Sequence, residues 1–353
     1  MSFRLVAHSD LGGRGDGMQV VREGDALYVG HFGISGMGTT ILDVSDPSHP
    51  RVAEQWAAPP GTHTHKVQVA DGLLLVNQER FRGAAEWTGG MLVYDVSEPL
   101  APRELGHLDV GGQGVHRIVW TGGRYAHASA IPEGCGDRIW IVIDLADPER
   151  PVEAARFALD EPQPEGERYA AHHALVDGDV AYLGYGDAGM VVLDVADYTR
   201  PRQIGRLEWE GGDTHTCLPL PGRKLVVVTD EQVRDGPDAP PRRIRVVDVA
   251  DPASPRVVAV CPEPPERRGP LRYGPHNLHE NRGFRSERIV YATYFNAGLV
   301  VYDLADPERP RLVDQWLPDD LERPQINDLY VEESGLVWVT DRISGGLYAL
   351  ERD

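Results

Sequence analysis

Short apolar runs separated by polar turns recur along the whole chain. Residues 63–109 show one complete set: "HTHKVQV", the turn "ADG", "LLLVNQE", a longer loop, "GMLVYDV", a proline-containing turn and "RELGHLDV". Short runs that are rich in Val, Leu and Tyr and bounded by Gly, Pro or Asp are typical of β-strands. The pattern therefore predicts four short strands in this segment.

A motif at the end of the third strand of each set repeats along the sequence. It is an apolar run, an aspartate and a turn that ends in proline, as in "TILDVSDPSHP" (40–50) and "VVYDLADPERP" (300–310). The aspartates, 52, 49, 50, 54 and 55 residues apart, are Asp43, Asp95, Asp144, Asp194, Asp248 and Asp303. This period suits the four-stranded blade of a β-propeller. We assign the turn a structural role, because Asp caps turns and Pro stops further strand pairing.

The two ends of the chain complete the repeat. "GGLYALERD" (345–353) matches a third strand without a fourth strand after it, and "FRLVAHSDL" (3–11) matches the fourth strands of the other sets. The N-terminal strand is therefore expected to close the last blade, which removes an exposed edge. The sequence predicts an all-β fold, a single domain over residues 1–353 that forms a seven-bladed β-propeller with four-stranded blades.

The strands "WIVID" (140–144) and "LVVYD" (299–303) resemble those of the LVIVD-repeat β-propeller family. The resemblance extends over nearly the whole chain and implies the propeller fold. It implies no particular reaction, because one fold carries many functions.

Charge and composition restrict the partners. The chain has 35 basic and 55 acidic side chains and a formal net charge of −20, which disfavours nucleic acid and anionic membrane surfaces. No apolar run reaches the length of roughly 18 residues that a membrane helix needs. The three cysteines contain no CxxC pair and do not indicate a disulfide scaffold. We expect a cytoplasmic protein that acts on a small molecule.

Histidines recur at the start of the first strand in five consecutive repeats. They are His65, His116, His172 or His173, His215 and His276. In a propeller the first strands line the central channel, so these side chains would converge at one of its mouths. Imidazoles gathered there without a cation would leave lone pairs unsatisfied. The pattern therefore predicts one metal ion bound by histidines, with only one of His172 and His173 facing the channel.

The donor set indicates the metal and the chemistry. Imidazoles suit Fe, Mn, Cu, Zn or Ni rather than Ca or Mg, and we favour Fe(II). By geometry alone the set resembles the carotenoid cleavage oxygenases, where four histidines of a propeller hold iron, and the oligogalacturonate lyases, where propeller histidines hold manganese. We expect a mononuclear metalloenzyme. An oxidoreductase of the oxygenase type is slightly favoured, because an all-neutral ligand set leaves the ion its full charge. One alternative is a metal-dependent lyase or hydrolase, and another is a non-catalytic scaffold for protein–protein interaction.

The loops between second and third strands would open at the same mouth. A carboxylate there could orient a ligating histidine or act as a general base. The candidates for this catalytic role are Glu79, Asp187, Asp230 and Glu231. The candidates for substrate contact at the rim are His31, His63, Arg80, His127, Tyr294 and Asp328.

Overall fold

The computed structural model describes residues 2–209, 211–233, 242–281 and 284–352. The chain divides into two compact units. Unit 1 consists of Leu159–Val337 with the terminal segments Met1–Arg4 and Glu351–Asp353, and unit 2 consists of Leu5–Ala158 with Trp338–Leu350. The described residues form β-strands and one short 3-10 turn, η1 (Pro221–Arg223). The predicted all-β class is confirmed, and no described helix is long and apolar enough to cross a membrane.

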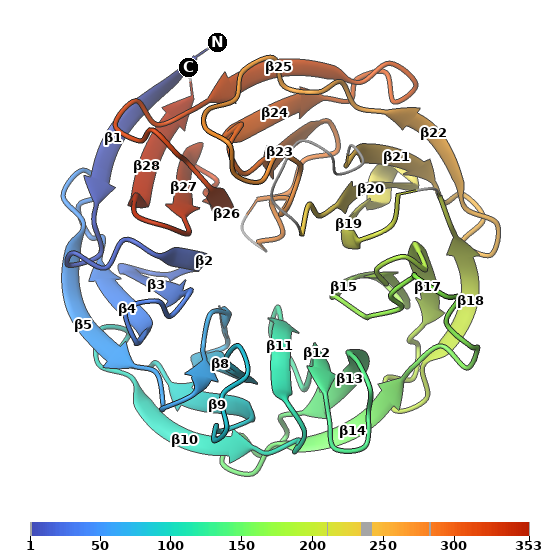
Figure 1. Ribbon diagram of the computed structural model, residues 1–353, viewed down its shortest axis with the longest axis horizontal. Coiled ribbons are helices and arrows are strands. Elements are labelled where there is room, and N and C mark those ends of the chain that lie inside the picture. Colours follow the sequence, from blue (N-terminus) through green and yellow to red (C-terminus); the bar gives the residue numbers. More distant parts are fainter. Residues whose placement is uncertain (1, 210, 234–241, 282–283, 353) are drawn as a thin grey trace. The chain divides into compact units, whose positions relative to one another are not determined.

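Unit 2 is built from antiparallel strands that mostly pair with their sequence neighbours (Figure 1). One sheet has four strands, β2 (Gly17–Glu23), β3 (Ala26–His31), β4 (Met37–Asp43) and β5 (Arg51–Ala57). The strands that follow are β6 (Thr62–His63), β7 (Val67–Ala70), β8 (Leu73–Arg80), β9 (Gly90–Asp95), β10 (Arg103–Leu108), β11 (Gly114–Val119), β12 (Tyr125–Ile131), β13 (Ile139–Asp144) and β14 (Val152–Phe157). They form one sheet in the order β10-β9-β8-β11-β12-β13-β14, with β6 and β7 also paired to β8. The N-terminal strand β1 (Phe3–Ser9) pairs with β28 (Gly346–Arg352), whose other neighbour is β27 (Leu336–Asp341).

Unit 1 repeats the four-stranded arrangement. The first sheet comprises β15 (Ala174–Asp177), β16 (Val180–Gly184), β17 (Met190–Asp194) and β18 (Arg202–Leu207). The second comprises β19 (Thr214–Leu220), β20 (Leu225–Asp230), β21 (Ile244–Asp248) and β22 (Arg256–Val260). A third has β23 (Ile289–Thr293), β24 (Leu299–Asp303) and β25 (Arg311–Trp316), and β26 (Ile326–Val331) follows it in sequence. The predicted four-stranded antiparallel organisation is confirmed for the first two of these sheets, whereas the third has three strands.

The third strands of several sets are buried along almost their whole length. β13 is buried along its whole length except at its terminal aspartate, and β24 is buried throughout. A strand covered on both faces needs a continuous apolar sequence rather than an alternating one, which explains the runs "IWIVID" and "LVVYD". The fourth strands, such as β5 and β22, are largely exposed.

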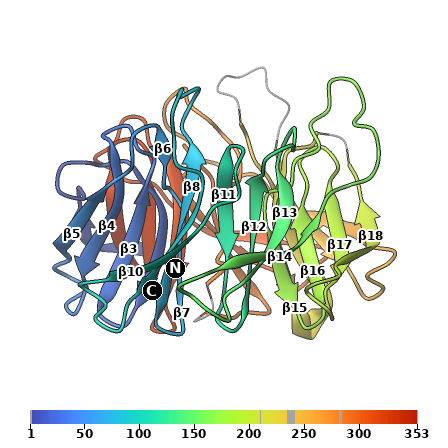
Figure 2. The ribbon, with the colours of Figure 1, turned by 90° about the horizontal axis from the view of Figure 1, so that it is seen from below.

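The exposed fourth strands are protected by β-bulges. Six pairings of a third strand with the fourth strand after it, from β4 with β5 to β24 with β25, each shift register at least once. A bulge increases the twist of an edge strand and makes it a poor template for a further strand. Figure 2 shows the result in unit 2, where β14 runs obliquely to β11, β12 and β13.

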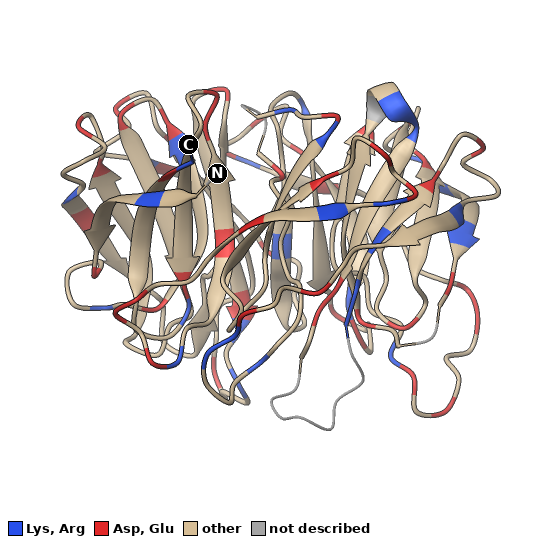
Figure 3. Ribbon diagram, turned by 90° about the horizontal axis from the view of Figure 1, so that it is seen from above, with Lys and Arg blue, Asp and Glu red and all other residues tan. Residues whose placement is uncertain are grey.

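The repeated aspartate ties the third strand to the fourth. Asp43 accepts hydrogen bonds from the backbone and hydroxyl of Ser45 and pairs with Arg51, eight positions later. The same spacing recurs in the pairs Asp95–Arg103, Asp194–Arg202, Asp248–Arg256 and Asp303–Arg311. Figure 3 shows both signs of charge distributed over the strands and turns. The motif therefore has the structural role predicted for it.

Candidate metal centre

Three segments of unit 1 bring histidines and a glutamate together. His215 lies on β19, Glu231 follows β20 directly, and His276 lies in the segment before β23. His172 precedes β15, and its backbone N–H bonds to the carbonyl of Gly184. A Cβ on Gly184 would lie 2.3 Å from the carbonyl oxygen of His215, so only glycine allows β16 this close to β19. The close approach sets His172 beside His215, with ring centroids 3.7 Å apart.

Hydrogen bonds fix which nitrogen of His276 carries the proton and constrain that of His215. Nδ1 of His276 lies 2.6 Å from the carbonyl oxygen of Asn327, which can only accept, so Nδ1 is protonated and Nε2 holds the lone pair. Nδ1 of His215 lies 2.8 Å from the hydroxyl of Thr216, and this hydroxyl donates to the carbonyl of His276 at 3.4 Å. When this hydroxyl accepts from Nδ1 of His215, the lone pair of that ring is also on Nε2. His276 has, and His215 can adopt, the tautomer of metal-ligating histidines.

His172 and His173 form a hydrogen-bonded chain that ends on a carboxylate. Nε2 of His173 donates to Oε1 of Glu280 at 3.0 Å, so Nδ1 of His173 is an acceptor. Nδ1 of His172 lies 2.6 Å from that atom and must donate to it. The lone pair of His172 is then on Nε2, and the centroid of this ring lies 3.7 Å from that of His215. The prediction left open which of the two histidines faces the site, and these contacts favour His172.

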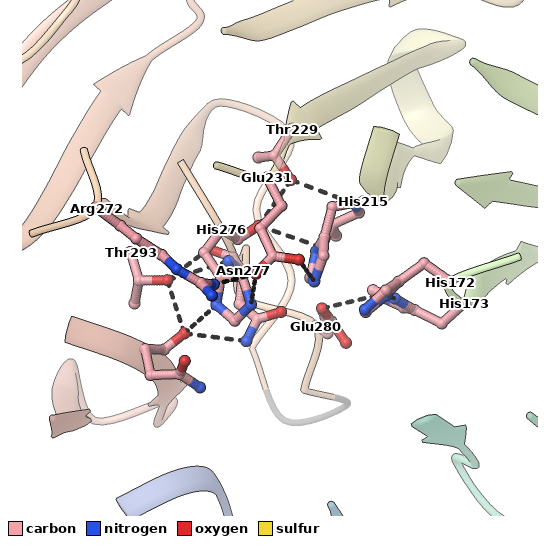
Figure 4. Close-up of polar contacts among 12 residues, drawn as sticks. His172, His173, His215, Thr229, Glu231, Arg272, His276, Asn277, Glu280 and Thr293 are labelled. Carbon is pink, nitrogen blue, oxygen red and sulfur yellow. Dashed lines mark hydrogen bonds and ion pairs between the residues drawn. The ribbon is translucent and has the colours of Figure 1, made fainter. Parts of the chain in front are cut away.

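Glu231 lies between His215 and His276 (Figure 4). Its Oε2 is 3.9 Å from Nε2 of His215, and its Oε1 is 3.8 Å from Nε2 of His276. One ligand atom from each of the three residues lies within 4.8 Å of the others. Oε1 of Glu231 also accepts from Nη1 of Arg272 at 3.1 Å. We call His215, Glu231 and His276 the unit 1 triad.

The remaining predicted metal ligands, His65 and His116, lie in unit 2. Their ring centroids are 5.1 Å apart. Glu79 on β8 accepts from Nδ1 of His116 at 2.8 Å, and His63 stacks on His65 with a centroid distance of 3.8 Å. The predicted histidines thus fall into two groups, each gathered within its own unit.

Two of the predicted catalytic carboxylates have structural partners. Asp230 is buried and accepts from Arg245 and from Nε1 of Trp209. Burial raises the pKa of Asp230 to about 6, although the charge of Arg245 opposes this shift. Asp187 accepts from the backbone N–H groups of Arg168 and Asp213 and so closes a loop. These contacts favour a scaffolding role for both.

The predicted rim residues are also engaged in local contacts. His31 is buried between Asp16 and Thr40, at 2.7 Å from each. His127 packs on Trp140. Arg80 donates a hydrogen bond to the carbonyl of Ala84 and stacks over the ring of Trp87. The hydroxyl of Tyr294 donates to the carbonyl of Arg242, and Asp328 is buried on β26.

Sequence reasoning missed most of the groups that orient the histidines. Arg272 and Thr216 carry no motif of their own, and Asn327 acts through its backbone carbonyl, which every residue type has. Glu280 lies in the dense polar segment "GPHNLHENRG" (274–283), from which the sequence left open whether it faces the channel or sits in the turn.

Comparison with known proteins identifies the repeat and the fold. Residues 14–57 and 170–208 match the LVIVD repeat family, which confirms the resemblance seen in the sequence. No curated protein sequence matches the chain.

Three solved structures are similar in fold. A protein from Lactobacillus plantarum is 12% identical, with a TM-score of 0.67 over 96% of this chain and 91% of its own. The periplasmic gluconolactonase of Pseudomonas aeruginosa is 18% identical, with a TM-score of 0.57 over 85% and 84%. A hypothetical selenium-binding protein from Sulfolobus tokodaii is 12% identical, with a TM-score of 0.64 over 92% and 84%. At these identities the similarity shows the fold alone.

Proposed function

We propose that this LVIVD-repeat protein is a metal-dependent hydrolase of small esters or lactones, with its centre at the unit 1 triad. The observation that carries the proposal is the arrangement of His215 and His276. Nδ1 of each ring contacts a hydrogen-bond partner on its far side. Nε2 of His215 lies 3.9 Å, and Nε2 of His276 3.8 Å, from a carboxylate oxygen of Glu231. We further propose that the sheets are the blades of a seven-bladed propeller.

The donor set fits a transition metal. Two neutral imidazoles and one carboxylate are the protein ligands of hydrolytic zinc sites, and three protein ligands leave a position open. The side chains of His215 and His276 are almost completely buried, whereas that of Glu231 is 16% exposed, which leaves a path from solvent. A divalent metal held there would supply a bound water with a pKa near neutrality.

The reason for favouring an oxygenase does not apply to this site. That expectation rested on an all-neutral ligand set, but Glu231 lies with His215 and His276. A set of two histidines and one carboxylate also occurs in non-haem iron oxygenases, so the triad alone does not separate the two reactions. The fold similarity to a gluconolactonase favours hydrolysis.

His172 is placed to act as the general base. Its Nε2 accepts the proton of the attacking water while the oxygen of that water bonds to the carbonyl carbon. His173 and Glu280 hold the His172 ring and stabilise its positive charge, as the buried aspartate does in a serine protease triad. The proton then passes to the leaving alkoxide as the carbon–oxygen bond breaks. His172 is neutral again at the end of the cycle.

The proposal is tested with untagged protein, a panel of aryl esters and γ- and δ-lactones, and an oxygen electrode. We expect hydrolysis that is lost on chelation and restored by Zn²⁺ or Mn²⁺, without oxygen uptake. His215→Ala and His276→Ala should lose both metal and activity. His49→Ala is the matched control, because His49 lies exposed in a turn with Asp46 and Ser48.

Two results would contradict the proposal. Oxygen consumption with Fe²⁺ and no hydrolysis would assign the centre to an oxygenase. Metal content below ~0.2 equivalents after reconstitution would favour the non-catalytic scaffold, since a metal-dependent hydrolase must take up its ion.

A further inference from the structure

Unit 2 contains its own group of histidines around a buried carboxylate. We propose that His63, His65 and Glu79 form a second transition-metal site. The chain then binds two metal ions rather than the single shared ion that the histidine pattern predicts. The inference stands apart from the proposed hydrolysis, because every residue in it belongs to unit 2.

The pairing of three strands brings these side chains together. His63 on β6 is the direct partner of Glu79 on β8, and opposed residues on one face of a sheet lie within contact distance. Gly114 at the start of β11 also pairs with Glu79. A Cβ on Gly114 would lie 2.2 Å from the carbonyl oxygen of Gln78, and its φ is +89°. Only glycine permits β11 to approach β8 this closely, and the approach places His116 against Glu79.

The position of His65 follows the same rule as that of His215. A Cβ on Gly30, near the end of β3, would lie 2.6 Å from the backbone carbonyl of His65. Gly184 at the end of β16 has the corresponding approach to His215. Each unit therefore uses a glycine on the second strand of one set to place a histidine of the next set.

The donor atoms are close enough to share one ion. One ligand atom each from His63, His65 and Glu79 lies within 4.8 Å of the other two. Donors on one transition metal are at most roughly 4 Å apart, because each bond is about 2.0–2.2 Å long. A small side-chain movement closes the difference. The edges of Phe32 and Phe81 hold the His63 ring, with centroid distances of 5.6 and 5.4 Å.

The His63 ring carries the second independent observation. Its Nε2 is buried and has no hydrogen-bond partner among the described residues, and a buried polar atom without a partner is costly. Nδ1 of the same ring lies 3.8 Å from Oε2 of Glu79, so the ring borders the carboxylate with a nitrogen atom.

The carboxylate of Glu79 is the acidic ligand of the site. Its Oε2 lies 2.8 Å from Nδ1 of His116 and 3.8 Å from Nδ1 of His63. Lys66 and Arg117 place positive charge near His65 and oppose a cation. Without the negative charge of Glu79 the site would therefore repel the metal.

Two neighbours tune the ligands. His116 donates from Nδ1 to Oε2 of Glu79 at 2.8 Å and orients the carboxylate. Asn77 donates to Nδ1 of His65 at 3.3 Å, a long bond beside its 2.8 Å bond to the carbonyl of Val115. Coordination of a metal through Nε2 of His65 would move the ring proton to Nδ1, which gives up this bond and leaves two N–H donors 3.3 Å apart.

The test counts metal ions in isosteric variants. Untagged apoprotein is loaded with Zn²⁺, freed of excess metal by gel filtration and analysed for zinc per chain, with Co²⁺ absorbance as a second readout. We expect about two equivalents for the wild type and for His49→Ala, and about one for Glu79→Gln or Glu231→Gln. His116→Ala should weaken the unit 2 site by ~10–100-fold, the effect typical of a group that orients a ligand.

The outcomes separate this inference from the proposed function. Two equivalents in Glu79→Gln would overturn the second site. One equivalent in the wild type, lost in both glutamine variants, would overturn it in favour of a single shared ion and leave metal-dependent hydrolysis standing. Metal loss in Glu79→Gln alone would support the second site and contradict the unit 1 triad. His63→Asn replaces Glu79→Gln if that variant melts at a lower temperature.

Discussion

Removing one hydroxyl group next to the unit 1 triad tests whether tautomer control matters for metal binding. Thr216→Val keeps the shape of the side chain but deletes the acceptor 2.8 Å from Nδ1 of His215. The proton of His215 is then free to move to Nε2, the atom that must carry the lone pair for a metal. Loss of such an orienting group typically costs 10–100-fold in metal affinity, which corresponds to about 1.4–2.8 kcal/mol.

The matched control is Thr340→Val in unit 2. The buried hydroxyl of Thr340 donates to the carbonyl of Met18 at 2.7 Å, far in sequence from any of the histidines discussed. Its loss should cost about 1 kcal/mol of stability and leave metal affinity unchanged. The assay is competition for Zn²⁺ between the apoprotein and a chelating dye, with a thermal melt of each variant. Equal affinity of Thr216→Val and the wild type would refute the role assigned to Thr216.

Three further predictions concern the relay, the strand crossing and pH. Glu280→Gln should lower kcat about 10-fold or more, because the carboxylate acts only through His173 and His172. Metal content and KM should stay unchanged, and the pH profile of kcat should shift. A change in KM alone would contradict this role. Gly114→Ala should destabilise the fold more than Gly123→Ala in denaturant titrations. Both glycines have positive φ, but only a Cβ at Gly114 would meet backbone atoms, and strain of this kind costs about 1–3 kcal/mol. Equal effects of the two substitutions would rule out the close approach of β11 to β8. Burial lowers the pKa of His279 from 6.5 to about 4, so the folded state binds fewer protons than the unfolded chain in this window. The stability that neutral His279 contributes is fully present above pH 6.5 and falls by up to roughly 3 kcal/mol as the pH drops toward 4. His279→Gln should therefore reduce the dependence of the unfolding free energy on pH in urea titrations. An unchanged dependence would assign this loss of stability to another residue.

Much of the strand architecture could be predicted from the sequence, because its causes are local. Buried third strands require runs such as "WIVID", and the turn after each needs Asp and Pro. Three histidines, His65, His116 and His215, could be recognised because each lies six residues before the following turn, whereas His276 and His172 or His173 depart from that spacing.

The grouping of the candidate site could not be predicted in the same way. A register of histidines says that side chains share a position in the repeat, but it does not say which carboxylate approaches them. Glu231 and Glu280 reach the histidines from segments distant in sequence, and the acceptor for His276 is the backbone carbonyl of Asn327. The favoured redox chemistry assumed that no carboxylate would join the ligands, and Glu231 does lie beside them.

The measurement that tests the central claim most directly is anomalous diffraction at the zinc edge from crystals of the Zn²⁺-loaded protein. The account predicts a peak about 2.0–2.2 Å from Nε2 of His215, Nε2 of His276 and a carboxylate oxygen of Glu231. A fully loaded crystal without density at these three atoms would contradict it.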